Sequence, residues 1–327
     1  MKKYQHYING EWIDSTGNEL IAVVNPATEE VIGEISAANK DDIGLAVVAA
    51  KAAYDSRVLV DMNPMERAKL MRSIADELRK VSKDGGALLC EENGKLLGAS
   101  EYEFLDAANY FDYYSGLTDK IEGQTIPVNN QVMDYTLYEP YGVSGHIVPW
   151  NFPISMLARS LACSFAAGNS TVIKPAELTP LATTSFFAQA IHNAGVPKGL
   201  VNIVTGYGVE AGAALTSHDD VAQITFTGSV KTGKTILHAA AERAVPAVVE
   251  LGGKSAAVVL PDADIDKVVN ATKVGIFSQA GQICSAMSRM IVHKSIKDEV
   301  LDKLSELAKS IKVGPGNEEG VDLTPVI

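Results

Sequence analysis

The chain has 327 residues and an acidic composition, with 40 Asp and Glu residues against 28 Lys and Arg residues, which gives a formal net charge of −12. This length is typical of two domains, and a hydrophobic content of 46% supplies a core for each, which excludes disorder as the main state. An acidic surface without a cluster of basic residues repels phosphate backbones, so we expect no nucleic-acid partner.

The first part of the chain predicts a short β-rich start followed by amphipathic helices. The polar and aromatic amino terminus has no apolar stretch typical of a secretory signal, so we expect a cytoplasmic protein. Asp41 can cap a first helix, and a second helix would have Asn63 as its N-cap and Pro64 as its first residue. Residues 123–140 then predict a protruding β-hairpin, because the turn-prone pair Asn129-Asn130 is flanked by apolar residues.

Residues 140–173 contain one Lys, Arg, Asp or Glu side chain, that of Arg159, and are nominally long enough to cross a bilayer. Glycines, prolines and asparagines recur along this segment and would break a spanning helix. A buried strand, a turn and a buried helix fit the segment better, so we expect no membrane association.

From Val143 onwards, predicted strands alternate with predicted helices. The strands are expected at 143–148, 171–174, 201–204, 222–226, 247–250 and 256–260, and the helices at 154–167, 181–194, 209–217 and 230–243. This alternation indicates parallel βαβ units in a doubly wound α/β sheet. Ligands of such sheets bind beyond the carboxyl ends of the strands, so residues that directly follow strands are the first candidates for a site.

Residues 228–235 match the P-loop pattern GxxxxGK[ST] between a predicted strand and a predicted helix, which would favour an NTPase. The only passable Walker B carboxylate is Asp262, which belongs to the cap of the next helix. The NTPase is therefore a remote alternative. The start of a helix would still favour an anion, such as the pyrophosphate of a dinucleotide, and a plain turn is the third possibility.

Three polar residues lie just after a predicted strand, at the end of one, or in a loop of small residues. Asn151 lies between two prolines that fix its backbone, so its amide either offers N–H donors to a ligand or only satisfies a turn. Glu250 ends a predicted strand ahead of a Gly-Gly turn, and Cys284 lies in a loop of small residues. A cysteine thiolate is a strong nucleophile towards carbonyl carbons. We expect Cys90 and Cys163 to be inert buried thiols, the latter inside an apolar helix.

The three cysteines and six histidines show no spacing typical of a disulfide framework or a structural zinc site, so we expect neither a disulfide nor a metal.

Taken together, five segments in this order resemble the aldehyde dehydrogenase superfamily, and the likeness runs from Tyr7 to Ile327. Cys284 follows Asn151 by 133 residues, a spacing that matches the family. The segments are Pro149–Pro153, Lys174–Glu177, Phe226–Ser229, Glu250–Ser255 and Gly281–Ala286. The resemblance implies a Rossmann-like NAD-binding domain of residues 1–122 and 141–250, a β-hairpin oligomerisation arm at 123–140, and a partial α/β catalytic domain at 251–327. The resemblance also implies that the chain forms homodimers or homotetramers.

The resemblance assigns chemistry to the three polar residues. Cys284 would attack the carbonyl carbon of a small-molecule aldehyde, while the Asn151 amide and the Cys284 backbone N–H hold the developing oxyanion. Loss of hydride gives a thioester, and Glu250 would act as general base on the water that hydrolyses it to a carboxylic acid.

Cofactor residues follow from the same resemblance. Lys174 and Glu177 would contact the adenosine ribose, and the Gly228-Ser229 turn would hold the pyrophosphate. The backbone of Pro149 and Trp150, together with Leu251, would line the nicotinamide side. A carboxylate at Glu177 accepts hydrogen bonds from two ribose hydroxyls better than it faces a phosphate, so we expect NAD rather than NADP, with dual use open.

Two features depart from the family pattern. Many members have a lysine nine residues after the asparagine, where this chain has Ser160 preceded by Arg159. The sequence also ends at Ile327, before the family's Glu-Ile-Phe-Gly-Pro motif and terminal strand. We therefore expect a C-terminally truncated member, and a catalytically inactive NAD-binding fragment is the alternative.

Overall fold

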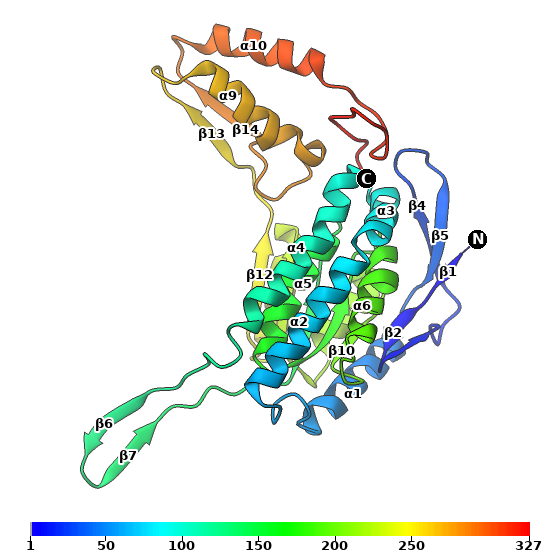
Figure 1. Cartoon of the computed structure of the whole chain (residues 1–327), viewed down its shortest axis with the longest axis vertical. Helices are drawn as coiled ribbons and strands as arrows, with labels where there is room; N and C mark the ends of the chain where they lie inside the picture. The colour runs from blue at the N-terminus through cyan, green and yellow to red at the C-terminus, as the bar shows by residue number, and fades with distance from the viewer. Residues whose placement is uncertain (1) are drawn as a thin grey trace.

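A seven-stranded sheet forms the centre of the computed structural model, which describes residues 2–327 (Figure 1). The strand order is β12-β11-β8-β9-β10-β2-β3, with the first five strands parallel and the last two antiparallel to their neighbours. The strands are β2 (His6–Ile8), β3 (Glu11–Ile13), β8 (Val143–Ile147), β9 (Ser170–Lys174), β10 (Val201–Ile203), β11 (Val221–Gly228) and β12 (Ala247–Leu251). The doubly wound parallel sheet expected from the sequence is confirmed.

Helices cover both faces of this sheet, and each face has its own apolar core. One core joins α1 to β8, β9 and β11, through residues such as Val47, Val143 and Ile224. The other joins α2, α4 and α5 to β9 and β10, through residues such as Met71, Phe111 and Leu161. The helices are α1 (Lys40–Asp55), α2 (Pro64–Lys80), α3 (Ser82–Asn93), α4 (Leu97–Ser115), α5 (Pro153–Ala166), α6 (Ala188–Asn193), α7 (Ala213–Ser217) and α8 (Val230–Glu242). π-helical turns, η1 (Thr183–Phe187) and η2 (Gly208–Gly212), lead into α6 and α7.

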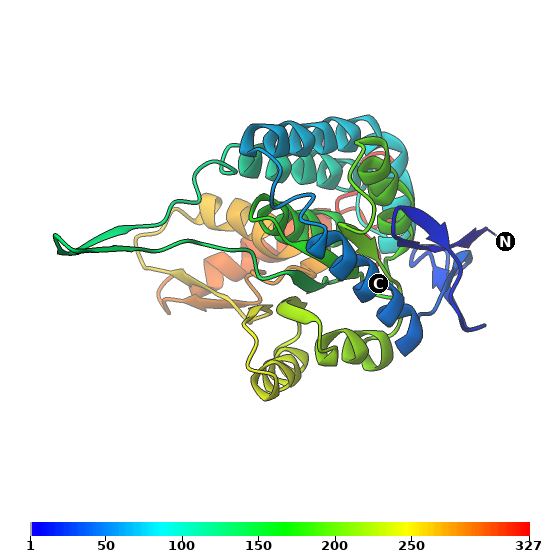
Figure 2. The ribbon, with the colours of Figure 1, turned by 90° about the horizontal axis from the view of Figure 1, so that it is seen from below.

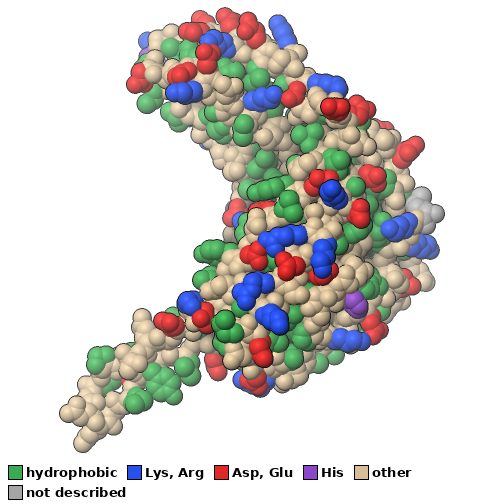
Figure 3. All heavy atoms as spheres, in the orientation of Figure 1, with side chains coloured by type: hydrophobic (Ala, Val, Ile, Leu, Met, Phe, Trp, Pro, Cys, Tyr) green, Lys and Arg blue, Asp and Glu red, His purple; other side chains and the backbone are tan. Residues whose placement is uncertain are grey.

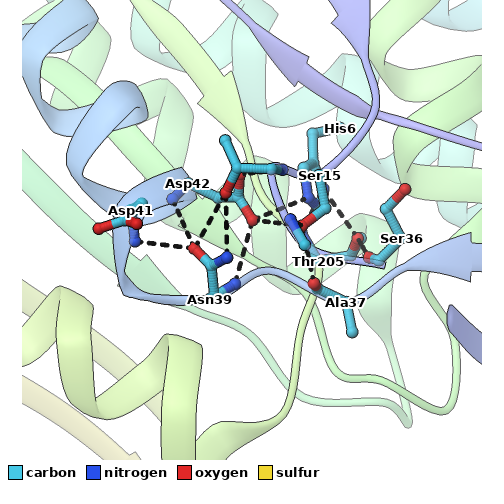
Figure 4. A network of polar contacts seen from close by, with 10 residues as sticks. His6, Ser15, Ser36, Ala37, Asn39, Asp41, Asp42 and Thr205 are labelled. Carbon is cyan, nitrogen blue, oxygen red and sulfur yellow. Dashed lines mark hydrogen bonds and ion pairs between the residues drawn. The ribbon is translucent and has the colours of Figure 1, made fainter. Parts of the chain in front are cut away.

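A polar network ties the amino-terminal strands to the start of α1 and the end of β10 (Figure 4). Asn39 Oδ1 accepts hydrogen bonds from the backbone N–H groups of Asp41 and Asp42, at 2.8 and 3.0 Å, and Asp42 Oδ2 accepts one from Asn39 N at 3.1 Å. Asn39 is therefore the N-cap, and the prediction of Asp41 was wrong, because a capping box places Asp42 at the third helical position. The Nδ1 atom of the buried His6 lies 3.0 Å from the Thr205 hydroxyl.

Two smaller sheets complete the amino-terminal half. A three-stranded sheet of order β1-β5-β4 packs beside the main body, and its strands are β1 (Lys3–Tyr4), β4 (Leu20–Val24) and β5 (Val31–Ser36). Strands β6 (Thr125–Asn129) and β7 (Val132–Tyr135) form the expected hairpin, which projects far from the body (Figures 1 and 2). Every residue of these two strands is exposed.

Residues after β12 form a second α/β unit at the opposite end of the molecule from the hairpin (Figure 1). Its parallel strands are β13 (Ala256–Val259) and β14 (Arg289–Val292), and its helices are α9 (Ile265–Thr272), η3 (Lys273–Phe277), η4 (Ser278–Gly281) and α10 (Lys297–Ser310). The chain then returns to the body, where Leu97 N donates to the Gly316 carbonyl at 2.9 Å. Figure 3 shows a concave side between this unit and the body.

Candidate active site

The predicted site residues gather at one edge of the main sheet. From β8 the chain proceeds outward to β9 and β10, whereas β11 and β12 lie on the other side of β8. The strand order therefore reverses between β8 and β11, and ligands of open α/β sheets bind beyond the carboxyl ends of strands at such a point. Asn151 follows β8, Lys174 ends β9, Ser229 follows β11 and Glu250 lies near the end of β12.

Asn151 lies against the loop that carries Cys284. Its Nδ2 donates to the Gln282 carbonyl at 2.9 Å, and its Oδ1 accepts from Phe152 N at 3.1 Å. The Gln279 side-chain amide donates to the Asn151 carbonyl. Two predicted segments that are distant in the sequence, Pro149–Pro153 and Gly281–Ala286, are thus in direct contact.

The loop before Cys284 has an unusual backbone. Gln279, Ala280 and Gly281 have φ values of 50°, 54° and 74°, all in the left-handed region. Non-glycine residues rarely adopt this region, and each costs on the order of 1 kcal/mol. The Cys284 side chain is exposed, and a Cβ atom placed on Gly253 would lie 3.9 Å from the Cys284 carbonyl oxygen. Cys284 therefore lies close to the Gly252-Gly253 turn that follows β12.

Glu250 faces a neighbouring cavity of about 620 Å³. Its half-exposed carboxylate lies 4.0 Å from the Arg159 guanidinium. Arg159 and Ser160 come from α5 and line the same cavity, whose other lining residues are aromatic, aliphatic and polar and include Glu139. The structure therefore brings Asn151 to the Cys284 loop, and it brings Glu250 towards Arg159.

Cys163 was expected to be buried and is exposed. The apolar face of α5, which includes Leu157 and Leu161, packs into the core, whereas Met156, Arg159 and Cys163 recur at helical spacing on the opposite face and line the cavity. Cys90 is buried as expected, and burial raises the pKa of its thiol to about 11.

Ser160 contacts a buried histidine. Its Oγ lies 2.9 Å from His146 Nδ1, and the Nε2 atom of the same ring lies 2.9 Å from Ser144 Oγ. Burial lowers the pKa of His146 to about 4, so the ring is neutral at neutral pH.

Lys174 and Glu177 form a pair at the end of β9. The buried Lys174 ammonium donates to the carbonyls of Pro175 at 2.6 Å and Gly206 at 2.8 Å, and Glu177 Oε2 lies 3.4 Å away. Burial lowers the pKa of Lys174, an effect that Glu177 opposes. The partly exposed Glu177 carboxylate keeps acceptor capacity for hydroxyl groups, which fits the ribose of a dinucleotide.

The turn from β11 to α8 excludes a P-loop. Strand β11 ends at Gly228 and α8 begins at Val230, so only Ser229 separates them. Ser229 is the N-cap of α8, and its Oγ accepts from Thr232 N at 3.1 Å. A P-loop needs a longer glycine-rich loop whose N–H groups surround phosphates, whereas the equivalent residues here are helical.

The start of α8 packs against the end of β12 through a leucine side chain. A Cβ atom on Gly233 would lie 2.4 Å from Leu251 Cδ2, so the Leu251 side chain packs directly on the helix backbone at Gly233. The first turn of α8 therefore lies beside the end of β12, with Ser229 exposed at the edge where the strand order reverses. This arrangement fits the pyrophosphate of a dinucleotide, because N–H groups at a helix start favour anions.

Two buried residues that were not predicted from the sequence hold the backbone of the Asn151 turn. Asn93 Nδ2 donates to the Trp150 carbonyl at 2.7 Å, and Lys95 Nζ donates to the Asn151 carbonyl at 2.6 Å. Lys95 is also paired with Glu103 on α4. Lys95 and Glu103 are eight residues apart and not at the spacing of neighbours on one helix, so no sequence pattern marked the pair.

Among residues 2–327, no group of three or more His, Cys, Asp or Glu side chains is placed to hold a metal ion. Within the same described residues, no helix combines the length and the apolar character needed to cross a membrane.

Comparisons with known proteins agree with the resemblance. The sequence profile described as "Aldehyde dehydrogenase family" matches residues 12–327. The chain is 42% identical over 311 residues to aldehyde dehydrogenase family 2 member C4 of Arabidopsis thaliana, covering 94% of this chain and 62% of the relative. It is 41% identical over 330 residues to the peroxisomal aminoaldehyde dehydrogenase 1 of Pisum sativum, covering 99% of this chain and 65% of the relative.

Solved structures give the same result for the fold. The NAD⁺ complex of an aldehyde dehydrogenase from Bacillus cereus superposes with a TM-score of 0.96 at 38% identity, covering 100% of this chain and 66% of that chain. A 3,6-anhydro-L-galactose dehydrogenase described as a complex with NAP superposes with a TM-score of 0.96 at 32% identity, covering 99% of this chain and 68% of that chain. The chain thus spans less than two thirds of the length of the Arabidopsis and pea relatives.

Proposed function

Because the chain belongs to the aldehyde dehydrogenase family, we propose that it oxidises an aldehyde to a carboxylic acid with hydride transfer to NAD, through a covalent adduct on Cys284. The observation that carries the proposal is the 2.9 Å hydrogen bond from Asn151 to Gln282, which joins the asparagine turn to the cysteine loop. Acyl chemistry needs the nucleophile and the oxyanion donor in one site, and this contact holds the Asn151 turn against the loop that carries Cys284.

In the first step, the Cys284 thiolate forms a bond to the aldehyde carbon. The exposed side chain gives a substrate access to the sulfur. The Asn151 amide has two N–H donors, one of which is bonded to Gln282, so the other can stabilise the oxyanion together with the Cys284 backbone N–H. Collapse of the adduct expels hydride and leaves a thioester on Cys284.

In the second step, Glu250 takes a proton from the water that attacks the thioester, which releases the carboxylic acid and restores the thiol. Its carboxylate lies within 4.0 Å of Arg159 and is half-exposed, so water reaches it. We propose that Glu250 turns from Arg159 towards the cysteine loop during this step, a motion that the flexible glycines after Leu251 permit.

The cofactor supplies the hydride acceptor when it is bound. In this proposal Lys174 and Glu177 bind the adenosine ribose, the Gly228-Ser229 turn binds the pyrophosphate, and the backbone of Pro149 and Trp150 with Leu251 flanks the nicotinamide. The half-exposed Glu177 carboxylate supports NAD over NADP, because it would repel a 2′-phosphate. We also propose that the chain can use NADP, at lower efficiency than NAD.

A second candidate is an NAD-binding protein without turnover. One observation favours it: the proposed cofactor residues lie in strands of the seven-stranded sheet or in the turns that follow them, whereas Cys284 lies in an exposed loop of the second unit. Binding and turnover are therefore separable properties of this chain.

We also propose that the protein is cytoplasmic and forms a homodimer or homotetramer. The three cysteines are free, as is typical of a reducing compartment such as the cytoplasm. The exposed hairpin of β6 and β7 would bind a second copy of the chain, in a homodimer or homotetramer.

NADH formation across a panel of aliphatic and aromatic aldehydes, followed in the first turnover and in the steady state, tests the mechanism. We expect Cys284→Ala to abolish turnover, and Glu250→Gln to retain one rapid NADH equivalent per chain while losing turnover, since the glutamate acts after hydride transfer. Cys163→Ala, which removes the other exposed thiol, is the matched control and should keep the wild-type rate. Equal rates for Cys284→Ala and wild type would refute the mechanism.

Fluorescence titration separates the two candidates. Trp150 is one of two tryptophans and lies at the proposed nicotinamide side, so NAD binding should quench its emission. Quenching by NAD without NADH formation from any aldehyde would favour the second candidate. Quenching followed by turnover would reject it, and the same kinetics with NADP measure the cofactor preference.

A further inference from the structure

The turn that carries Asn151 is held by a buried ionic pair that belongs to neither the proposed catalytic residues nor the proposed cofactor residues. Lys95 lies between α3 and α4, and its side chain is 1% exposed. Its ammonium donates to the Asn151 carbonyl at 2.6 Å, forms an ion pair with Glu103, and lies 4.6 Å above the centre of the Phe152 ring. A buried ammonium is stable only when its donors are satisfied, and these groups satisfy them.

Glu103 connects the same pair to the helix that follows the turn. Its Oε2 accepts hydrogen bonds from the backbone N–H groups of Ile154 at 3.1 Å and Ser155 at 3.2 Å. These groups lie in the first turn of α5, which has no side-chain cap of its own. A carboxylate at a helix start satisfies free N–H donors and complements the helix dipole, so Glu103 caps α5 from another helix.

The contacts leave little freedom for the Asn151 peptide. Its carbonyl oxygen accepts from both Lys95 and Gln279, which uses both lone pairs. The preceding carbonyl, of Trp150, accepts from Asn93 at 2.7 Å. The backbone is therefore held on both sides of the Asn151 Cα, whereas the side-chain amide points to the Cys284 loop.

We propose that Lys95, held by Glu103, is a positioning residue that fixes the Asn151 peptide and thereby directs the Asn151 amide at the oxyanion. The inference rests on the proposed function for its catalytic consequence, but the positioning itself is a property of the folded chain. An oxyanion donor contributes fully only when its geometry is fixed before reaction, and displacement by about 1 Å can cost about 100-fold in rate.

Amide hydrogen exchange of the full chain tests the positioning without any need for activity. We expect Lys95→Met to accelerate exchange in the peptide that covers residues 150–155, because the Asn151 carbonyl loses a donor and Glu103 loses its counter-ion. Arg67→Met is the matched control, since Arg67 is also buried and donates to Ala166 at 2.8 Å, at the other end of α5. Unchanged exchange at 150–155 in Lys95→Met, or equal acceleration in Arg67→Met, would overturn the inference.

A double-mutant cycle tests the catalytic consequence. We expect Lys95→Met to lower kcat by about 10- to 100-fold with little change in the KM for NAD, and to add almost nothing in an Asn151→Ala background. A merely structural role would lower kcat by the same factor in both backgrounds, and that result would contradict the proposal. A wild-type chain that oxidises no aldehyde would reject the proposed function, while the exchange experiment would still decide the positioning.

Glu103→Gln serves as the second variant if Lys95→Met does not fold. It preserves the side-chain volume and an acceptor for the α5 amides, but removes the anion that holds Lys95. We expect the same local acceleration of exchange, smaller than in Lys95→Met, and the same lack of additivity with Asn151→Ala. Wild-type exchange and additive kinetics in this variant would contradict the inference.

Discussion

His6 and His146 are buried on different strands of the main sheet, and burial lowers the pKa of each to about 4. The rings are neutral in the folded protein at neutral pH, whereas the unfolded chain takes up protons near the ordinary pKa of 6.5. The stabilising effect of keeping the rings neutral is therefore complete above pH 6.5 and is lost as the pH falls from 6.5 towards 4.

We expect the free energy of unfolding to fall by about 2 kcal/mol for each of the two histidines between about pH 7.5 and about pH 5, at about 1.4 kcal/mol per pH unit. Urea unfolding at the two pH values measures this loss. His146→Gln should remove about half of it, and His238→Gln, at an exposed position on α8, should leave it unchanged. An equal loss in wild type and His146→Gln would show that the ring does not control acid stability.

The residues of the candidate site differ in how well the sequence could identify them. Asn151, Glu250 and Cys284 follow strands or lie in small-residue loops, so local pattern and family resemblance identified them. Lys95 and Glu103 were missed because their role depends on the approach of α4 to the start of α5, which no local pattern encodes. The prediction that Cys163 is buried was wrong, because a mostly apolar helix still has one face that lines a cavity.

At the scale of elements, the start of α1 offers two candidate N-cap residues, Asn39 and Asp41, and the structure shows Asn39 in this role. Asn39 accepts hydrogen bonds from the first turn, and Asp42 reciprocates, whereas the side chain of Asp41 is exposed. Asn39 also donates to Thr16 at 3.0 Å, which links the cap to the loop before β4. The cap therefore joins helix formation to packing of the amino-terminal strands.

We expect Asn39→Ala to lower the free energy of unfolding by about 1 kcal/mol, because the first-turn N–H groups lose their acceptor. Asp41→Asn is the matched control and should change stability by less than about 0.5 kcal/mol, since its side chain makes no cap. Thermal unfolding of both variants decides between them. A larger loss of stability in Asp41→Asn than in Asn39→Ala would support Asp41 as the N-cap, as the sequence alone predicted.

Element boundaries followed the expected pattern where apolar runs were long. Predicted strands between residues 143 and 260 occur within a few residues of their expected ends, because short apolar or β-branched runs bounded by turn residues mark strands. The helix predicted at 181–194 begins at Leu181 as expected, and the π-helical turn η1 at Thr183–Phe187 interrupts its α-helical geometry. The buried Glu92 carboxylate accepts the N–H groups of Leu181 and Ala182, at 2.6 and 3.0 Å, so a residue distant in the sequence caps this region.

At the scale of the whole molecule, the hairpin projects from the body with its apolar side chains in solvent (Figures 1 and 3). Met133 is 83% exposed, and Val128 and Tyr135 are each more than half exposed. Isolated two-stranded hairpins are marginal in water, and exposed apolar patches mark interaction surfaces. These properties support the proposed role of the hairpin as an oligomerisation arm.

We expect the wild-type chain to sediment as a dimer or larger species, and Val128→Asp combined with Met133→Asp to shift it towards the monomer, because charges oppose burial in an interface. Thermal stability of the monomer body should not change, since the hairpin strands contribute no buried side chain. Asn130→Asp at the hairpin tip is the control for added charge. A wild-type monomer in sedimentation velocity would contradict the arm proposal.

The sequence by itself determined the order of strands and helices and the parallel sheet, and it supplied Cys284, Asn151 and Glu250 as the proposed nucleophile, amide donor and base. These depend on hydrophobic periodicity, turn chemistry and short motifs, which act over neighbouring residues. The tertiary structure decided which side chains meet: Asn151 with the Cys284 loop, Glu250 with Arg159, and Lys95 and Glu103 with the back of the asparagine turn. Such contacts join residues separated by up to 131 positions, and they form only when packing of whole helices against the sheet fixes the distances between them.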